Sequence, residues 1–172
     1  MKSQIIALSI GLVGFATTSN AQATATATAT ATIVTPISIT KNTDMNFGNV
    51  AVQASTGGTV VLTPAGTRTR TSGVTLPATV GTVAAAAFTV NGTGTYTYAI
   101  TLPSSALTLT HSGGAGTGTM TADNFTSTPS ATGALTAGAQ NITVGATLNV
   151  AAAQAPGVYL SSPGFDVTVN YN

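Results

Sequence analysis

The N-terminal part of the chain carries its longest regular alternation of hydrophobic and polar residues. Between positions 23 and 39 the odd positions hold alanine or isoleucine apart from Thr35, while the even positions are threonine up to Thr32. A period of two predicts a β-strand with one buried face. At about 3.3 Å per residue this run would extend roughly 55 Å, whereas ordinary strands reach only about 17–20 Å. We therefore expect part of it to leave the domain.

The sequence supports two interpretations of this stretch. A repeated Ala-Thr pattern is of low complexity and suits a solvated tail. Alternatively, the run is a strand donated to another molecule, in which Ile33, Ile37 and Ile39 fill a groove and each contribute about 1.5–3 kcal/mol by burial. Pro36 lacks an N–H group, so it restricts that position to a sheet edge or a break.

The C-terminus shows the same period of two. Its hydrophobic residues lie on one face of a predicted terminal strand and alternate with polar ones. Such a strand is either an ordinary edge strand that packs the core or one that also docks an assembly partner. The hydrophobic residues are Phe165, Val167, Val169 and Tyr171.

Between the two ends, short β-rich runs alternate with Gly, Pro and Asn turn signals. Many short strands of this kind predict an all-β fold, a single antiparallel sandwich or barrel domain. The run 83–87 (VAAAA) also allows a helical turn. The expected strands are 45–52, 59–63, 87–90, 95–102, 106–110, 119–125, 142–150, 158–160 and 165–171.

Composition strengthens the all-β prediction and limits the chemistry. The chain has 36 Thr, 19 Gly and 7 Pro, a mixture that favours extended chain and turns over long helices. Only 4% of residues are charged, with four Lys or Arg and three Asp. That number of cations excludes a basic nucleic-acid binder. Without cysteine, the fold has no disulfide.

The first residues have the order of a secretory signal peptide. Lys2 precedes an apolar run at 5–15, and small residues follow up to Ala21, after which we expect cleavage. The predicted organisation is therefore a signal peptide at 1–21, an Ala-Thr extension at 22–32 and a β-sandwich domain at 33–172. No later segment approaches the roughly 20 apolar residues of a membrane span. We expect export to the periplasm, the outer surface or the medium.

Residues suited to catalysis or metal binding are few and scattered. His111 is the one histidine and stands in a turn context, and Asp44 and Asp123 each stand alone among Asn and Thr. The glycines at 113–118 lack the lysine of a phosphate loop and predict a hairpin loop. We expect no enzyme, no cofactor and no metal site.

Arg68 and Arg70 lie two positions apart, so on a strand they share a face. They are candidates for contact with an acidic glycan or protein partner. Alternatively, they protect an edge strand against aggregation.

Several short segments carry a resemblance to a known family. They are 45–48 (MNFG), 58–62 (GTVVL), 88–92 (FTVNG), 102–103 (LP), 144–148 (VGATL), 156–159 (PGVY) and 167–171 (VTVNY). Over roughly residues 30–172 the chain resembles the bacterial secreted family called domain of unknown function 4402. Its layout is also similar to the spore coat protein U and archaic chaperone-usher pilin subunits. That similarity implies an immunoglobulin-like sandwich completed by a donated N-terminal strand, and a terminal strand with Tyr171 that engages a periplasmic chaperone. The chain departs from that group in having no cysteine pair and an alanine-rich donor run.

Three functions follow as hypotheses. The first is an exported, non-enzymatic cell-surface subunit, pilin-like or adhesin-like, which assembles with itself or with related subunits by strand donation. The alternative is a monomeric surface domain that binds a glycan or another cell through Arg68 and Arg70. A minor alternative is an ice-binding protein, prompted by the Thr-x-Thr rows at 24–32 and 67–71.

Overall fold

A computed structural model of the protein describes residues 21–113 and 118–172. The chain divides into two units along the sequence, and the second runs from Val34 to Asn172. Residues 21–33 have no regular secondary structure and are exposed throughout. The expected signal peptide, apart from Ala21, lies outside the described residues.

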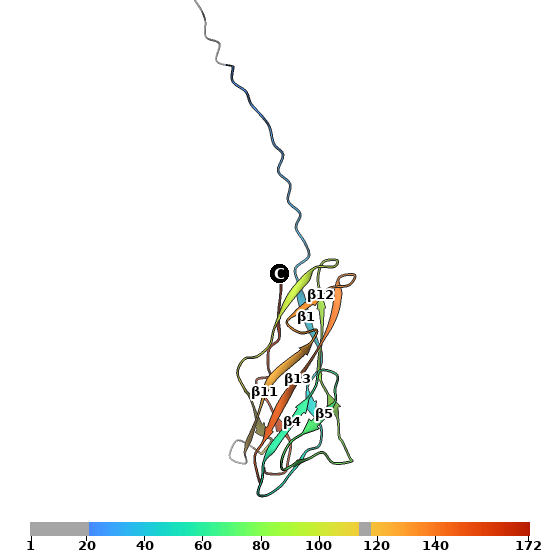
Figure 1. The fold of residues 1–172 in the computed structure, drawn as a ribbon, viewed down its shortest axis with the longest axis vertical. Coiled ribbons are helices and arrows are strands. Elements are labelled where there is room, and N and C mark those ends of the chain that lie inside the picture. The colour runs from blue at the N-terminus through green and yellow to red at the C-terminus, as the bar shows by residue number, and fades with distance from the viewer. Residues whose placement is uncertain (1–20, 114–117) are drawn as a thin grey trace, which may run out of the picture. The chain divides into compact units, whose positions relative to one another are not determined.

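The second unit consists of antiparallel β-strands joined by turns and loops (Figure 1). The described residues contain no helix, which confirms the all-β prediction. The strands are β1 (Ser38–Thr43), β2 (Asn46–Phe47), β3 (Ala51–Val52), β4 (Gly58–Leu62), β5 (Arg68–Arg70), β6 (Val74–Thr75), β7 (Val83–Ala84), β8 (Ala86–Asn91), β9 (Thr97–Thr101), β10 (Leu107–His111), β11 (Thr119–Thr128), β12 (Thr132–Ala134), β13 (Ala139–Val150), β14 (Tyr159–Leu160) and β15 (Thr168–Tyr171).

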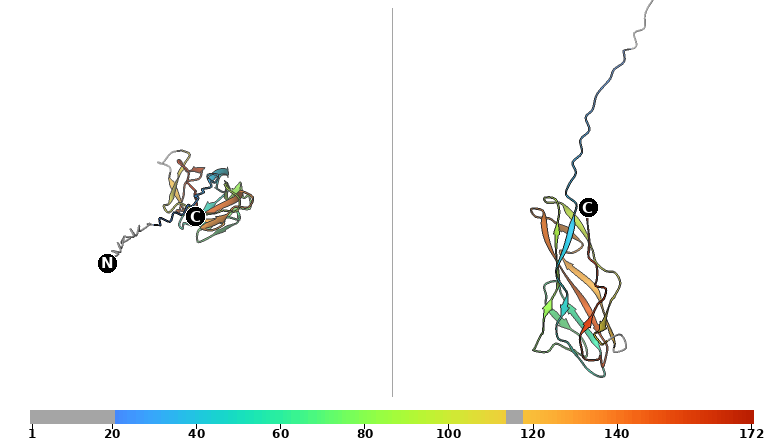
Figure 2. Two further views of the ribbon diagram at one scale, coloured as in Figure 1. Left: turned by 90° about the horizontal axis from the view of Figure 1, so that it is seen from above. Right: turned by 180° about the vertical axis from the view of Figure 1, so that it is seen from behind.

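The largest sheet is organised around the long strand β13. Strand β11 pairs with one edge of β13, while the other edge is shared by β8, which pairs with residues 139–144, and β4, which pairs with residues 146–150. The sheet continues to β1 beyond β8, to β5 beyond β4, and to β10 and β14 beyond β11. Seen from above, its strands curl strongly around the interior (Figure 2). One long strand therefore joins both halves of the unit.

A second sheet has the order β12-β9-β15, and two further pairs, β2–β7 and β3–β6, cover the remaining edges of the core. Alternate residues of these strands point inward and form two hydrophobic clusters. The buried residues of the first cluster are Ala86, Phe88, Val90, Tyr98, Ile100, Leu135, Ile142, Val144 and Val169. Those of the second are Phe47, Val60, Leu62, Val74, Ala122, Ala146, Leu148 and Val150.

Two expectations about local structure are wrong. The segment 45–52 is not one strand, because Gly48 turns the chain with φ +67° between β2 and β3, and its N–H donates to Asn46 Oδ1 at 2.8 Å. The alanines at 83–87 form no helical turn, since β7 and β8 take the chain there into two sheets. Of the alternating run at 23–39, only Ser38 and Ile39 lie in a paired strand, as the first two residues of β1.

Candidate functional site

Two sheets end side by side in this fold. Strand β1 is the last strand of the large sheet and pairs with β8, and β15 is the last strand of the three-stranded sheet and pairs with β9. The two strands lie close to each other. Within the described part of the chain neither has a second strand partner. We call the line between them the seam; an unpaired strand edge is a template for a further strand.

Beside the end of β1 the seam opens into a groove lined by both polar and apolar side chains. It lies between the chain around β2 and the chain around β14, two short strands that each end their own sheet. Two adjoining cavities of about 480 and 560 Å³ make up this groove. The large side chains that line both cavities are Met45, Phe47, Leu109, Tyr159 and Leu160. Phe165 lines the larger cavity alone.

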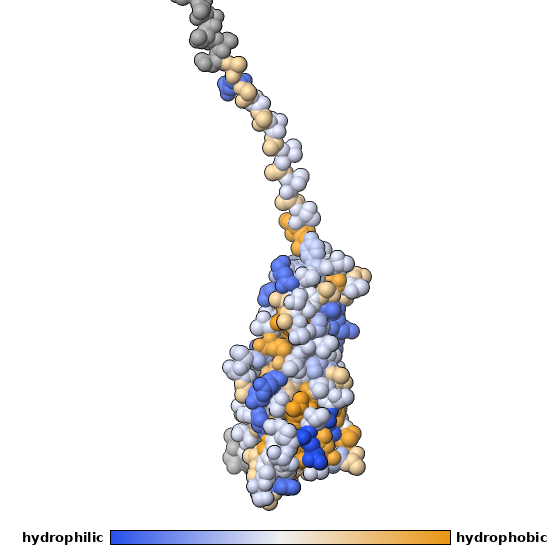
Figure 3. Space-filling model, viewed as in Figure 1, coloured by the Kyte–Doolittle hydropathy of each residue, from blue (hydrophilic) through white to orange (hydrophobic). Residues whose placement is uncertain are grey.

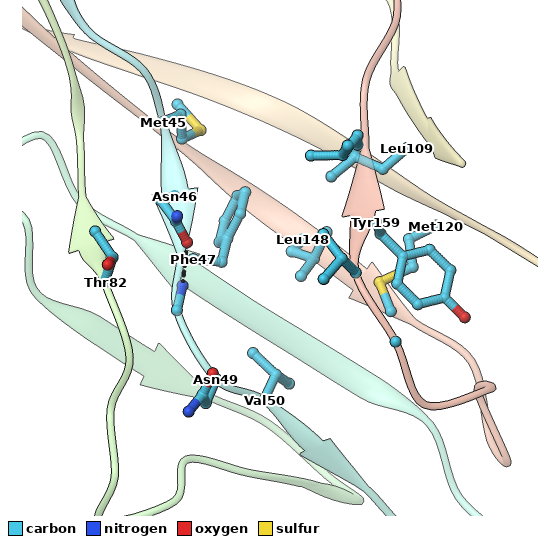
Figure 4. A pocket seen from close by; sticks show the side chains of 14 residues that line it. Met45, Asn46, Phe47, Asn49, Val50, Thr82, Leu109, Met120, Leu148 and Tyr159 are labelled. Atoms are coloured by element: carbon cyan, nitrogen blue, oxygen red, sulfur yellow. Dashed lines mark hydrogen bonds between the residues drawn. The ribbon is translucent and has the colours of Figure 1, made fainter. Parts of the chain in front are cut away.

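Figure 4 shows one end of the groove. Met45 and Phe47 come from the β2 side, and Leu109 and Tyr159 come from the side of β10 and β14. Leu160 is 61% exposed although it is a large aliphatic residue. Exposed apolar side chains next to unpaired backbone are the combination that an added strand would cover.

The floor of the seam near β15 is already filled by aromatic side chains. The ring of Phe165 lies edge-on to Phe88 with centroids 6.4 Å apart and tilted against Phe125 at 5.0 Å. Ile37 and Ile39 pack against the same cluster from the β1 side. Phe88 and Phe165 also line the larger cavity, together with Lys41 and Thr43 of β1.

Hydrogen bonds close the end of the seam opposite to the groove. The Tyr171 hydroxyl donates to the Thr35 carbonyl at 2.9 Å and accepts from the Thr93 N–H at 2.7 Å. The Thr35 N–H in turn donates to Thr93 Oγ1 at 2.8 Å. Tyr96 packs edge-on against Tyr171, with centroids 5.7 Å apart. We call these contacts the Tyr171 latch; they tie the chain just before β1 to the chain at the end of β15.

The structure separates the three isoleucines of the expected donor strand. Ile37 and Ile39 are half-buried against the first cluster, and Ile39 stands in β1 opposite Val90. Ile33 is 97% exposed. The four hydrophobic residues of the predicted terminal strand, Phe165, Val167, Val169 and Tyr171, all pack into or against that same cluster. Only Val169 and Tyr171 lie in β15, because the strand begins at Thr168 rather than at residue 165.

The two arginines are bonded to backbone carbonyls of their own unit. Arg68 Nη1 donates to the carbonyls of Phe47 and Asn49, the latter at 3.0 Å, and so fixes the turn at Gly48. Arg70 Nη1 donates to the Val74 carbonyl at 3.0 Å. Both side chains therefore have a structural use, and their binding of an acidic ligand stays a prediction.

The polar residues considered for catalysis lie apart and have local partners. The Nδ1 atom of His111 accepts from the Gly113 N–H at 2.9 Å, which leaves Nε2 to donate to the Pro156 carbonyl at 3.0 Å. Asp44 pairs with Lys41, and Asp123 accepts from Asn149 at 3.0 Å. The described ranges hold no group of three His, Cys, Asp or Glu suited to a metal ion.

One titratable group is perturbed by its surroundings. Burial raises the pKa of Tyr98, whose hydroxyl donates to Gln140 Oε1 at 2.6 Å. Tyr98 belongs to the first cluster and does not line the groove.

The groove residues Leu109 and Leu160 were not singled out from the sequence. Leu107 and Leu109 do alternate with threonine, which marks a two-faced strand. That pattern indicates which face is apolar, but it does not tell whether another strand covers it. As for membrane insertion, the residues described include no helix that could span a bilayer.

Comparison with protein families adds one finding. The model of a family described as Domain of unknown function (DUF4402) matches residues 37–171. Comparisons with curated proteins and with solved structures give no significant match.

Proposed function

The chain belongs to the DUF4402 family, whose description assigns no activity, so we propose its function from the geometry of the seam. We propose that it is an exported, non-enzymatic structural subunit of the cell surface that assembles by β-strand addition. The observation that carries the proposal is the pair of unpaired edges, β1 and β15, next to a groove that exposes Met45, Leu109 and Leu160. A strand between them would bond to both sheets through its backbone.

We further propose that the two sheets form an immunoglobulin-like sandwich that lacks one strand. Antiparallel sheets with inward-facing alternate residues support this architecture. The absent strand would lie between β1 and β15 and cover Met45, Leu109 and Leu160. A subunit with an open seam exposes apolar surface before assembly, so a periplasmic chaperone that covers the seam is a further proposed partner.

The surface of the domain is compatible with a pilin-like subunit. The face shown in Figure 3 is mostly pale, with few strongly hydrophilic side chains, and its hydrophobic side chains gather in separate patches. Threonine-rich strands supply hydroxyls for hydration in place of charge. The alternative of glycan binding is less well supported, since Arg68 and Arg70 are bonded to carbonyls of their own unit.

The test is self-complementation. The full chain is expressed with export and compared, by size-exclusion chromatography with light scattering, with a variant that carries a second copy of residues 22–40 at its C-terminus. We expect the unfused protein to form a series of multimers and the fused protein to be a monomer of higher melting temperature, because the fused strand fills its own seam.

A matched control carries the same residues in an order that destroys the alternation. It should assemble like the unfused protein, since it cannot place one apolar face into the seam. A stable monomer from the unfused chain, or equal behaviour of both fusions, would contradict strand addition.

A further inference from the structure

We propose that Met45 and Met120 are oxidation sites, at which hydroperoxides convert the thioether side chains to sulfoxides and so impair the groove. The two sites are assigned from their places in the groove and in the hydrophobic clusters. Only the consequence for assembly rests on the proposed function.

Sulfur is rare in this chain and is concentrated at the groove. The sequence contains three methionines and no cysteine. Met1 lies in the expected signal peptide, so Met45 and Met120 hold the sulfur atoms expected in the exported protein. Both side chains line the smaller cavity, and Met45 lines the larger one as well. An oxidant that reacts with sulfur would therefore act at this part of the molecule.

Both side chains are accessible to small solutes. Met45 and Met120 are half-buried, whereas Phe47 and Leu148 of the same cavity are buried. Figure 4 shows the two methionines on opposite sides of the cavity. Its volume of about 480 Å³ is many times the roughly 30 Å³ of a water molecule, and hydrogen peroxide has only one oxygen atom more than water.

The reaction balances with the oxidant alone. A lone pair of the methionine sulfur attacks one oxygen of the hydroperoxide, the O–O bond breaks, and an S–O bond forms. The second oxygen takes up the proton of the first and leaves as water, or as an alcohol if the hydroperoxide is organic. The sulfur loses two electrons and the peroxide gains them, so the step needs no further reactant.

A sulfoxide at position 45 would disturb both hydrophobic clusters. Met45 packs against the first and the second cluster, while Met120 packs against the second alone and pairs with Leu109 across β10 and β11. The S–O group is polar, and burying a polar group without a hydrogen bond is unfavourable. The oxidised side chain would therefore turn toward water and uncover its apolar neighbours. Met45 should have the larger effect, because it contacts both clusters.

The same change would oppose assembly. In the proposed function an added strand covers Met45 together with Leu109 and Leu160, so that strand would have to bury the sulfoxide. Free subunits would then lose the ability to accept a strand, whereas in assembled subunits the added strand shields the sulfur from the oxidant. Methionine sulfoxide reductases reverse the modification, so the loss is not permanent.

Mass spectrometry and thermal unfolding of the exported full chain test the assignment, on monomers isolated at low protein concentration. With hydrogen peroxide, we expect oxygen addition at both methionines at rates within about tenfold of those in urea-unfolded protein. The melting temperature should fall by at least about 3 °C and recover after treatment with sulfoxide reductases and a thiol. Rates slowed more than about a hundredfold by folding, or oxidation without a fall in melting temperature, would overturn the assignment.

Leucine variants assign the effect to each sulfur, since leucine is close to methionine in volume and has no sulfur to oxidise. On treatment, the melting temperature of Met45→Leu should fall little, that of Met120→Leu should fall nearly as in the wild type, and that of the double variant should not change. Val80→Met in the double-variant background is the control, because position 80 is 50% exposed and does not line the groove. Its sulfoxide should leave the melting temperature unchanged. An equal fall in the double variant would contradict the proposal.

Assembly is measured separately, after the oxidant has been removed and the protein concentrated. We expect treated wild-type subunits to remain monomers and treated double-variant subunits to form multimers, as measured by light scattering. Multimers from fully oxidised wild-type subunits would overturn the effect on assembly. If the untreated wild-type chain forms no multimers, the proposed function fails, while the oxidation rates and melting temperatures still decide whether the two sites are correct.

Discussion

At the scale of single residues, Tyr98 shows how the core accommodates a hydroxyl group. The side chain is fully buried and crosses the backbone of β12, and its hydroxyl donates to Gln140 Oε1, which also accepts from the Ala134 N–H at 2.9 Å. Gly133 faces Tyr98 across the sheet, and a Cβ atom at this position would overlap the ring. The packing of Tyr98 in β9 therefore requires both the small Gly133 in β12 and the amide of Gln140 in β13.

The raised pKa of Tyr98 predicts a loss of stability at alkaline pH. The folded state keeps the phenolic proton above pH 10, near which an unfolded tyrosine loses it. The stabilisation is therefore fully present below about pH 10 and lost as the pH rises further. Tyr98→Phe should lower the free energy of unfolding by about 1 kcal/mol at neutral pH, because one hydrogen bond is lost. The free energy of unfolding of this variant should then fall less steeply as the pH rises above about 10 than that of the wild type. Urea unfolding across this pH range measures both; an unchanged decline would contradict the prediction.

Gly133→Ala should destabilise the domain by about 1–3 kcal/mol, because the added methyl group would meet both Tyr98 and Gln140 Oε1. Gly164→Ala is the matched control, since no atom lies within 4 Å of a Cβ at that position. Melting temperatures of the two variants measured side by side test this difference, and equal values would speak against close packing at Gly133.

At the scale of elements, the Tyr171 latch connects the first strand to the last. Tyr171 is 136 positions away from Thr35, so this hydrogen bond joins the two ends of the domain's sequence. Strand β1 begins three residues after Thr35, where Ser38 pairs with Asn91 of β8. The β1 and β15 edges are held beside each other at this end and separate toward the groove.

Tyr171→Phe should loosen this junction without unfolding the domain. The Thr35 carbonyl and the Thr93 N–H would each lose a partner, at a cost of about 1–2 kcal/mol in total. Hydrogen exchange should quicken at residues 93 and 37–40, while β13 stays protected. Tyr96→Phe is the control, because its ring packs on Tyr171 but its hydroxyl takes no part in the latch. Uniform quickening in all strands would contradict a local role.

At the scale of the whole molecule, stability comes from apolar burial and backbone hydrogen bonds with little contribution from charge. Among the described residues Lys41 and Asp44 form the one ion pair, with side chains 57% and 80% exposed. Such a pair contributes little in water. Two contiguous hydrophobic clusters joined by β13 carry the fold instead.

Stability should therefore be nearly insensitive to simple salt. Between about 0.05 and about 1 M sodium chloride we expect the melting temperature to change by less than about 2 °C, since there is almost no charge interaction to screen. Sodium sulfate, which strengthens apolar burial, should raise it clearly. Scanning calorimetry in both salts tests this; a large fall in sodium chloride would show that charge matters more.

Much of the fold could be predicted from local patterns. Period-two runs such as those in β4, β10 and β13 identify strands because every second side chain must be apolar wherever one face of a sheet is buried. The same reasoning failed at 45–52, where the turn at Gly48 divides the run, and the alanine cluster at 83–87, taken as a possible helical turn, belongs to strands β7 and β8. The Gly48 turn depends on Arg68, twenty residues away, and no local pattern reveals that partner.

The sequence by itself determined the all-β class, the low charge and the two-faced character of both ends. Only the tertiary structure decided that Ile37 and Ile39 belong to their own core while Ile33 is exposed, and that β1 and β15 end side by side at an open groove. Alternation is a local property that any strand with one buried face must show. Which strand covers that face depends on pairing between distant segments, such as β1 with β8 and β15 with β9, and this pairing is settled only when the whole chain packs.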